Sequence, residues 1–265
     1  VTDGVLVANP KGMFSEHFFQ ICDCVSVQKC ARLHISNTNN NRPSHIDVKN
    51  FQYHLDSFNL PDVNCITDLG ICICNNLKFR MHINSIVSKA HQRSSLILRC
   101  FKCRDPIILL KAFVVYVRPL VEYCSQVWSP ISITDINKLE RVQRRFTMRL
   151  RGMQGLSYCE RLTRLNLQTL ELRRLLADLI FIFKVLKGLV IVDKNIFEFS
   201  HVTGLRGHSL KLVKPLSVIN CRKSFFACRI TDVWNCLPES IVKLNSVLLF
   251  KNAINHFNFE KFLHI

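Results

Sequence analysis

Glycine and proline are scarce in this chain of 265 residues, which contains only 8 of each. This scarcity excludes a collagen-like or low-complexity chain. Hydrophobic residues make up 48% of the sequence, an ordinary share for a globular protein. We therefore expect a chain that buries a hydrophobic core, organised as one large domain or two small ones.

Acidic residues are also few, with 19 Asp and Glu against 36 Lys and Arg, so the net charge is +17. Residues 1–78 carry 6 basic and 7 acidic side chains, whereas residues 79–265 carry 30 basic and 12 acidic ones. Such an excess repels itself unless an anionic surface is near, usually nucleic acid or an acidic membrane face. We therefore expect the second part of the chain to bind an anion.

Several catalytic motifs are absent. The sequence has neither phosphate-binding glycine pattern, G-x-x-x-x-G-K-[ST] or G-x-G-x-x-G, and it lacks His-Glu-x-x-His and Gly-x-Ser-x-Gly. It has no Asp-Asp, Asp-x-Asp or Glu-x-Asp, although two-metal phosphoryl transfer needs closely placed carboxylates. We therefore assign no catalytic residue, no metal ligand and no cofactor to this chain.

The 13 cysteines do not have the context of a small secreted disulfide framework, so we expect reduced thiols and an intracellular protein of the cytoplasm or nucleus. Three close pairs have ligand-like spacing, namely Cys22–Cys24, Cys72–Cys74 and Cys100–Cys103. The last pair has the spacing of half a zinc site. No second Cys-x-x-Cys or His pair follows at zinc-finger distance, so we favour buried or free thiols over zinc.

The hydrophobic pattern divides the chain into three parts. Residues 1–78 hold short apolar runs between polar turns, which predicts strands around 33–35, 51–60 and 68–73. Residues 79–190 have a period near 3.6, which predicts helices. Residues 191–265 combine an alternating segment at 206–213 with two further helices. The sequence thus predicts an α+β fold that is predominantly α-helical.

Capping signals place the helix boundaries. Asp105 followed by Pro106 is typical of a helix start, and Ser132 and Ser157 each stand three residues before an acid, as in a capping box. Gly188 is a typical helix stop. The expected helices are 79–104, 105 to a kink or stop at Pro119, 132–152, a short one from 157, 169–188, 222–236 and 246–257.

Residues 170–189 are the most apolar segment, and the stretch 175–192 has the length of a membrane span. Asp178, Lys184 and Lys187 interrupt it, and a charge near the centre of a bilayer is costly. We therefore interpret the segment as a buried core helix and expect no membrane partner.

The strongest functional signal is a basic helix. Six cations occur within fourteen residues: Lys138, Arg141, Arg144, Arg145, Arg149 and Arg151. Glu140 is the only acid inside this window, so pairing within the helix leaves most of the charge unneutralised. A solvated helix face is the alternative, but we favour contact with nucleic-acid phosphates, which arginine binds in a bidentate manner.

A series of short blocks follows in a recognisable order. The most specific is Tyr116–Pro130, which contains Arg-Pro-Leu-Val-Glu-Tyr. The others are Thr67–Gly70, Leu77–Ile83, Asp135–Thr147, Leu156–Leu162, Leu170–Arg174, Arg206–His208 and Val233–Pro238. Together these blocks closely resemble the C-terminal region of reverse transcriptases from non-LTR retrotransposons (LINE elements of the jockey and CR1 kind). The resemblance covers about residues 25–257.

The resemblance implies three structural regions. It assigns residues 1–78 to a remnant of the palm, 79–190 to a helical thumb and 191–265 to a connector, with an RNA–DNA hybrid or RNA as the partner of the basic helix. It also aligns Lys29 and Cys30 with a palm Lys-Cys element, although Ser26 replaces the family's asparagine there.

The catalytic turn of that family, Tyr-Ala-Asp-Asp, binds two magnesium ions. Only Val1-Thr2-Asp3-Gly4 stands near the place expected for it, and this segment has one carboxylate. Magnesium is therefore expected only in a full-length parent enzyme. We expect the chain to be part of a longer product and to be inactive as a polymerase by itself.

Two other hypotheses stay open. A helical protein-interaction module would meet an acidic partner with its basic helix and pack the apolar face of residues 170–185 on another chain. A decayed element would have no selected function. Phosphate contacts predict a steep linear loss of log affinity with log salt for any duplex, which distinguishes them from the interaction module.

Overall fold

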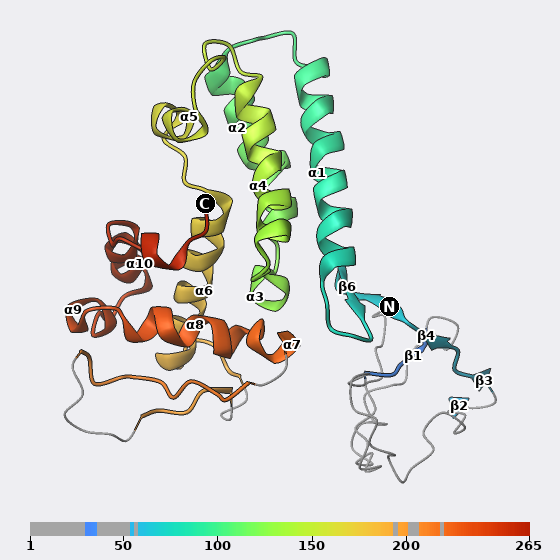
Figure 1. Cartoon of the computed structure of the whole chain (residues 1–265), viewed down its shortest axis with the longest axis vertical. Helices are drawn as coiled ribbons and strands as arrows, with labels where there is room; N and C mark the ends of the chain where they lie inside the picture. Colours follow the sequence, from blue (N-terminus) through green and yellow to red (C-terminus); the bar gives the residue numbers. More distant parts are fainter. Residues whose placement is uncertain (1–29, 36–53, 56–57, 193–195, 201–206, 218–219) are drawn as a thin grey trace. The chain divides into compact units, whose positions relative to one another are not determined.

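The computed structural model describes residues 30–35, 54–55, 58–192, 196–200, 207–217 and 220–265 (Figure 1). Packing divides the chain into one unit that ends at His82 and a second that begins at Ile83. The described residues are mostly helical with a few short strands, which confirms the predicted α+β class. Lys29, Cys22 and Cys24 lie outside the described residues.

The strands of the first unit form three pairs among the described residues. β1 (Arg32–Leu33) runs parallel to β4 (Asp62–Val63), and β2 (His54–Leu55) pairs antiparallel with β3 (Phe58–Asn59). β5 (Cys65–Asp68) and β6 (Ile71–Cys74) form an antiparallel hairpin.

The predicted strand at residues 68–73 is wrong, because the hairpin turn lies inside it. Leu69 and Gly70 connect β5 to β6 and have φ values of +46° and +82°. Two consecutive left-handed residues are typical of a tight two-residue hairpin turn, and glycine adopts that conformation without steric cost.

Helices make up most of the second unit. In chain order they are α1 (Arg80–Cys100), α2 (Pro106–Tyr116), the 3-10 turn η4 (Arg118–Val121), α3 (Ser125–Trp128), α4 (Ile133–Met148), α5 (Tyr158–Leu165), α6 (Leu170–Leu186), α7 (Asn220–Lys223), α8 (Phe226–Asn235), α9 (Glu239–Val242), α10 (Val247–Asn255) and the 3-10 turn η6 (Glu260–Phe262).

Local capping explains several of these boundaries. The Asp105 side chain accepts a hydrogen bond from the Ile107 amide at 2.7 Å, and Ser157 forms a complete capping box with Glu160. Ser132 forms no cap, because its hydroxyl bonds to the Thr134 hydroxyl at 2.8 Å. The predicted capping box at residues 132–135 is therefore wrong, although α4 does begin at that point.

The predicted helix 222–236 is two helices in the structure. α7 ends at Lys223, and Phe225 is extended, with φ −60° and ψ 141°, before α8 begins. The Arg229 guanidinium donates to the Ser224 carbonyl at 2.9 Å and so satisfies a backbone group at the break. A side chain one turn further along the chain thus compensates for the lost helical hydrogen bond.

Three helices lie side by side in the second unit (Figure 1). α1 and α4 run in the same direction, and α2 returns in the opposite one. The rings of Phe113 on α2 and Phe146 on α4 stack with centroids 4.6 Å apart. Lys138 on α4 donates to Asn84 on α1 at 2.9 Å. These contacts place α4 against both of the other helices.

The C-terminal core forms around α6. Leu179, Ile182 and Phe183 are completely buried against α8 and α10, and the ring of Phe183 stacks on Phe250 with centroids 4.1 Å apart. The apolar face of residues 170–185 is thus covered within the chain. Among the described helices, none combines the length and the apolar character that crossing a bilayer requires.

Both tryptophans are buried. Trp128 and Trp234 are each 1% exposed. Their ring N–H groups donate to the carbonyls of Tyr123 (2.8 Å) and Leu210 (2.9 Å). Buried and hydrogen-bonded rings of this kind support packing and are not available for base stacking.

Two of the blocks that carry the family resemblance contact each other in this core. The Asn235 side chain pairs with both backbone groups of Leu212, at 2.9 and 2.8 Å, as a neighbouring strand would. His208 Nε2 lies 3.0 Å from the carbonyl oxygen of Trp234. His208 and Asn235 therefore hold the extended segment 207–217 against α8.

Candidate nucleic-acid interface

The sequence of α4 separates an apolar face from a basic one. Ile136, Leu139, Val142 and Phe146 are at most 1% exposed and point into the core. Arg141, Arg145 and Arg149 are exposed and follow each other at intervals of four residues. Because side chains four residues apart share a helix face, these three arginines form one line, which we call the basic ridge.

The basic ridge borders a shallow hollow between α1 and α4. His91, Ser94, Ser95 and Leu98 line it from α1, while Val142, Arg145, Phe146 and Arg149 line it from α4. The two helices run in parallel, so each turn of α1 lies beside the corresponding turn of α4. The wall that α1 supplies is polar and carries no acidic residue.

The charge of the basic ridge is unpaired within the described part of the chain, where none of the three arginines has an ion-pair partner. Glu140, the nearest acid in the sequence, points away from the ridge and is completely buried. Burial lowers the pKa of His91, and the nearby Arg145, Arg141 and Arg149 lower it further. His91 is therefore neutral at pH 7, and the hollow has a positive potential that attracts anions.

The other predicted cations lie in different surroundings. Lys138 forms an ion pair with Asp135 at 2.9 Å and is half-buried. The Arg144 guanidinium lies 4.8 Å from the centroid of the Tyr158 ring and faces α5. Arg151 is exposed just beyond the end of α4. The structure thus brings Arg141, Arg145 and Arg149 together and places Lys138 and Arg144 in contacts with other parts of the chain.

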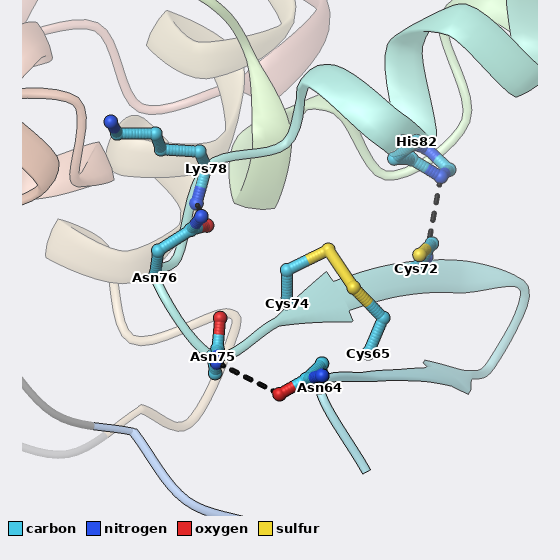
Figure 2. The surroundings of a disulfide bond; sticks show 8 residues. All are labelled: Asn64, Cys65, Cys72, Cys74, Asn75, Asn76, Lys78 and His82. Carbon is cyan, nitrogen blue, oxygen red and sulfur yellow. Dashed lines mark hydrogen bonds between the residues drawn. A yellow bond between two sulfur atoms is a disulfide. The ribbon is translucent and has the colours of Figure 1, made fainter.

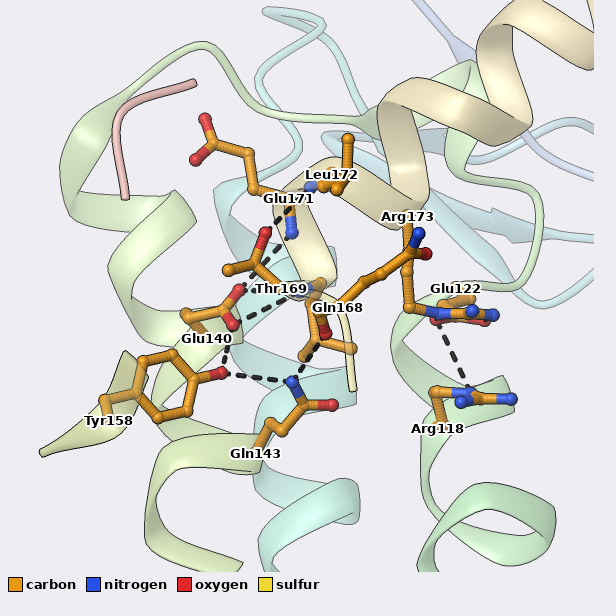
Figure 3. Close-up of polar contacts among 11 residues, drawn as sticks. Arg118, Glu122, Glu140, Gln143, Tyr158, Gln168, Thr169, Glu171, Leu172 and Arg173 are labelled. Carbon is orange, nitrogen blue, oxygen red and sulfur yellow. Dashed lines mark hydrogen bonds and ion pairs between the residues drawn. The ribbon is translucent and has the colours of Figure 1, made fainter. Parts of the chain in front are cut away.

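A buried polar network fixes the opposite side of α4 (Figure 3). The Glu140 carboxylate accepts hydrogen bonds from the Tyr158 hydroxyl and from the amides of Leu170 (3.0 Å) and Glu171 (3.3 Å). It thereby caps the N-terminus of α6, where a negative charge is favourable. Gln143 adds bonds to the Tyr158 hydroxyl (3.0 Å) and to the Gln168 carbonyl (2.9 Å). The network joins α4 to α5 and α6.

A second polar contact joins the Arg-Pro block to α6. The Arg173 guanidinium makes a two-pronged ion pair with Glu122, and the guanidinium of Arg118 lies 3.7 Å from the same carboxylate (Figure 3). Glu122 belongs to the most specific block of the resemblance. Its role in this structure is to hold two helical segments together, which accounts for an acid in an otherwise basic region.

Three basic residues that the sequence analysis did not select lie at the same end of the helical unit as Arg149 and Arg151. They are Arg99, Lys102 and Arg104, which are exposed at the C-terminal end of α1 and in the loop that follows it. Their position depends on the parallel arrangement of α1 and α4 (Figure 1). A pattern within one helix gives no signal of this, because the two helices are more than thirty residues apart.

The cysteines of the predicted pairs behave differently from one another. Cys100 and Cys103 are exposed and free. Cys74 is bonded to Cys65 in a disulfide, so the expectation that all thiols are reduced is wrong for this pair. The two residues stand directly opposite each other on β5 and β6, a contact that depends on strand register and is not visible in their spacing along the chain.

Comparison with known proteins gives a limited result. No protein-family profile matches the chain. No solved structure matches it. The chain is similar to the uncharacterized protein B0403.1 of Caenorhabditis elegans, with 29% identity over 128 residues. The aligned region covers 47% of the chain and 65% of that protein, so the chain spans less than two thirds of its relative's length.

Proposed function

We propose that this chain is the C-terminal part of a reverse transcriptase of the non-LTR retrotransposon type, and that its basic ridge binds the phosphate backbone of an RNA–DNA hybrid. The main support for the proposal is the basic ridge, whose three exposed arginines have no acidic partner among the described residues. The order of the sequence blocks supports the choice of family. No catalytic step is assigned to the chain.

The dimensions of the basic ridge suit a nucleic-acid backbone. Arg141 and Arg149 are eight residues apart, which corresponds to about 12 Å along a helix. One strand of a duplex advances about 3.4 Å per nucleotide, so the ridge spans about three to four nucleotides. Guanidinium groups bind phosphates in a bidentate manner, and contacts to phosphates carry no base information. We therefore expect binding that is independent of sequence.

The rigidity of α4 also favours this function. Its inner face is packed on α2 through Phe146 and is joined to α6 through Glu140. A fixed helix keeps the backbone positions of the three arginines in one geometry, so little backbone entropy is lost on binding.

The protein-interaction hypothesis requires two exposed surfaces, the basic ridge and the apolar face of α6. The apolar face of α6 packs on α8 and α10, so it is not available to another chain. An acidic protein partner of the basic ridge is the remaining form of that hypothesis. Its binding would also weaken in salt, but it would require a specific protein surface, whereas a phosphate-binding ridge accepts any duplex.

The decisive experiment changes Arg141, Arg145 and Arg149 together to Gln. Glutamine keeps the helix propensity nearly unchanged while it removes three charges. Each phosphate contact contributes about 0.9 to the slope of log affinity against log salt, so the slope should shrink by up to about 2.7. Between 50 and 200 mM salt, the wild type should therefore lose up to about 40-fold more affinity than the variant.

A matched control removes three charges elsewhere. Lys223, Lys251 and Lys261 are exposed, lie outside α1 and α4, and are changed to Gln in the control. Fluorescence anisotropy with labelled RNA–DNA hybrids of several sequences measures both variants. An equal loss in both would show that only the overall charge matters, and an unchanged slope in a folded ridge variant would exclude phosphate contact by the ridge.

A further inference from the structure

Three cysteines meet on one face of the β5–β6 hairpin. Cys65 pairs with Cys74 across the hairpin, and Thr67 pairs with Cys72. Because side chains alternate between the two faces of a strand, these four residues point to the same side. Cys72 is therefore the diagonal neighbour of Cys65 and shares its face with Cys74.

The sulfur atoms of these cysteines form a tight group. Among the described residues, one set of three or more potential metal ligands lies close together, and it consists of Cys65, Cys72 and Cys74, whose sulfurs are all within 4.8 Å of one another. Cys74 is 4% exposed and the other two are half-buried. The group is thus accessible to a small ion but shielded from bulk solvent.

His82 contacts the edge of the hairpin through the backbone of Cys72 (Figure 2). The ring of His82 is 4% exposed, and its Nδ1 accepts a hydrogen bond from the Cys72 amide at 3.3 Å. This contact fixes the backbone that carries Cys72. The side chain of Asn75 bonds to Asn64 at 3.3 Å and ties the open end of the hairpin. The three sulfurs therefore sit on a backbone that is held at both ends.

We propose that, when the Cys65–Cys74 disulfide is reduced, the thiolates of Cys65, Cys72 and Cys74 together bind one zinc ion. Zinc bonds to thiolate sulfur at about 2.3 Å, so sulfurs around a tetrahedral ion are about 3.8 Å apart. Three sulfurs already within 4.8 Å of one another reach that spacing by small side-chain rotations. A set of soft thiolate ligands selects zinc over hard cations such as magnesium.

A dithiol reduces the disulfide first. It supplies two electrons and two protons and becomes a disulfide itself, while the Cys65–Cys74 sulfur–sulfur bond breaks and two thiols form. Zinc then binds the three thiolates, and their three protons pass to solvent. The fourth position of the tetrahedron is taken by water, since both Cys65 and Cys72 are partly exposed. Exchange with an oxidised dithiol reverses the sequence: the reagent takes up two electrons and is reduced, Cys65 and Cys74 form the disulfide again, and the ion is released.

The inference is independent of the proposed function, because it uses residues of the first unit alone. It also gives Cys72 a role that the disulfide does not. Two cysteines are sufficient for the covalent bond, whereas the third sulfur completes a ligand set.

Titration of the reduced full-length chain with Co²⁺ as a spectroscopic probe of the zinc site tests the proposal. We expect one ion per chain, with the absorption bands of tetrahedral cobalt bonded to thiolates, and displacement by Zn²⁺. The variant Cys72→Ser keeps the Cys65–Cys74 pair and should bind at least about 100-fold more weakly, because even changes to residues behind the ligands cost about 10–100-fold. The double variant Cys100→Ser and Cys103→Ser is the control and should bind as the wild type does.

A second measurement covers the case in which the serine variant folds poorly. Zinc should protect Cys65, Cys72 and Cys74 of the wild-type chain from alkylation, detected by mass spectrometry, while Cys100 stays reactive. The oxidised chain should not bind the ion at this hairpin. Absence of stoichiometric binding, full affinity in Cys72→Ser, or protection of other cysteines in place of these three would each overturn the proposal.

Discussion

Replacing Glu140 by Ala tests whether the network behind the basic ridge stabilises the fold. The change removes the acceptor for the Tyr158 hydroxyl and for the amides of Leu170 and Glu171. A buried donor without a partner costs about 1–3 kcal/mol. Three such donors together cost more than about 3 kcal/mol. The substitution also removes the cost of burying the Glu140 carboxylate, which offsets part of this loss. We expect a net loss of about 3 kcal/mol.

The pH dependence of the same site gives an independent check. Burial raises the pKa of Glu140 above its ordinary value of 4.5. The folded state therefore holds the proton more tightly than the unfolded state. This contribution to stability is present below pH 4.5 and is lost as the pH rises through the folded-state pKa. The variant Glu140→Gln should lack this pH-dependent component.

Urea unfolding followed by circular dichroism measures both effects. Glu239 pairs with Lys243 on the surface and provides the control, because Glu239→Ala removes an exposed carboxylate without a buried donor. A folded Glu140→Ala variant that lost less than about 1 kcal/mol, with an unchanged dependence on urea, would refute the reasoning.

Four further results are expected. Arg229→Ala leaves the buried Asp178 carboxylate without its ion-pair partner at 2.9 Å and should lower the unfolding free energy by about 3–5 kcal/mol in thermal or urea unfolding. The pKa of His91, followed by NMR, should rise when hybrid binds the basic ridge, because phosphates offset the arginines that lower it. Tryptophan emission of the folded chain should be blue-shifted and resist quenching by iodide, because both rings are 1% exposed; strong quenching would contradict the packing. The purified chain should not extend a primer with magnesium or manganese, because its sequence has no paired aspartates; extension free of host polymerase would contradict this.

Local signals were sufficient to predict much of the fold. Asp105 marks the start of α2 and Ser157 that of α5, because a cap depends on residues within one turn. The alternation of buried and exposed residues on α4 follows directly from the helical period. The basic ridge was predictable for the same reason.

Contacts between residues that are far apart in the sequence could not be predicted from local patterns. Lys138 belongs to the basic run in the sequence, but Asn84, fifty-four residues earlier, accepts its hydrogen bond. Arg144 lies against Tyr158, which becomes its neighbour only after α5 folds back. The register of β5 on β6, which brings Cys65 to Cys74, is likewise set by the turn between the strands.

The division of α4 into a basic face and a buried face limits how its gene can change. A helix turns by about 100° per residue, so the insertion of one codon between Ile136 and Arg149 would rotate every later side chain by that angle. An insertion ahead of Arg141 would bring the three arginines of the ridge to the buried positions of Val142, Phe146 and Leu150. Related genes that are maintained by selection should therefore differ along α4 by substitutions and place their insertions in the loops, whereas decaying copies should show insertions in both.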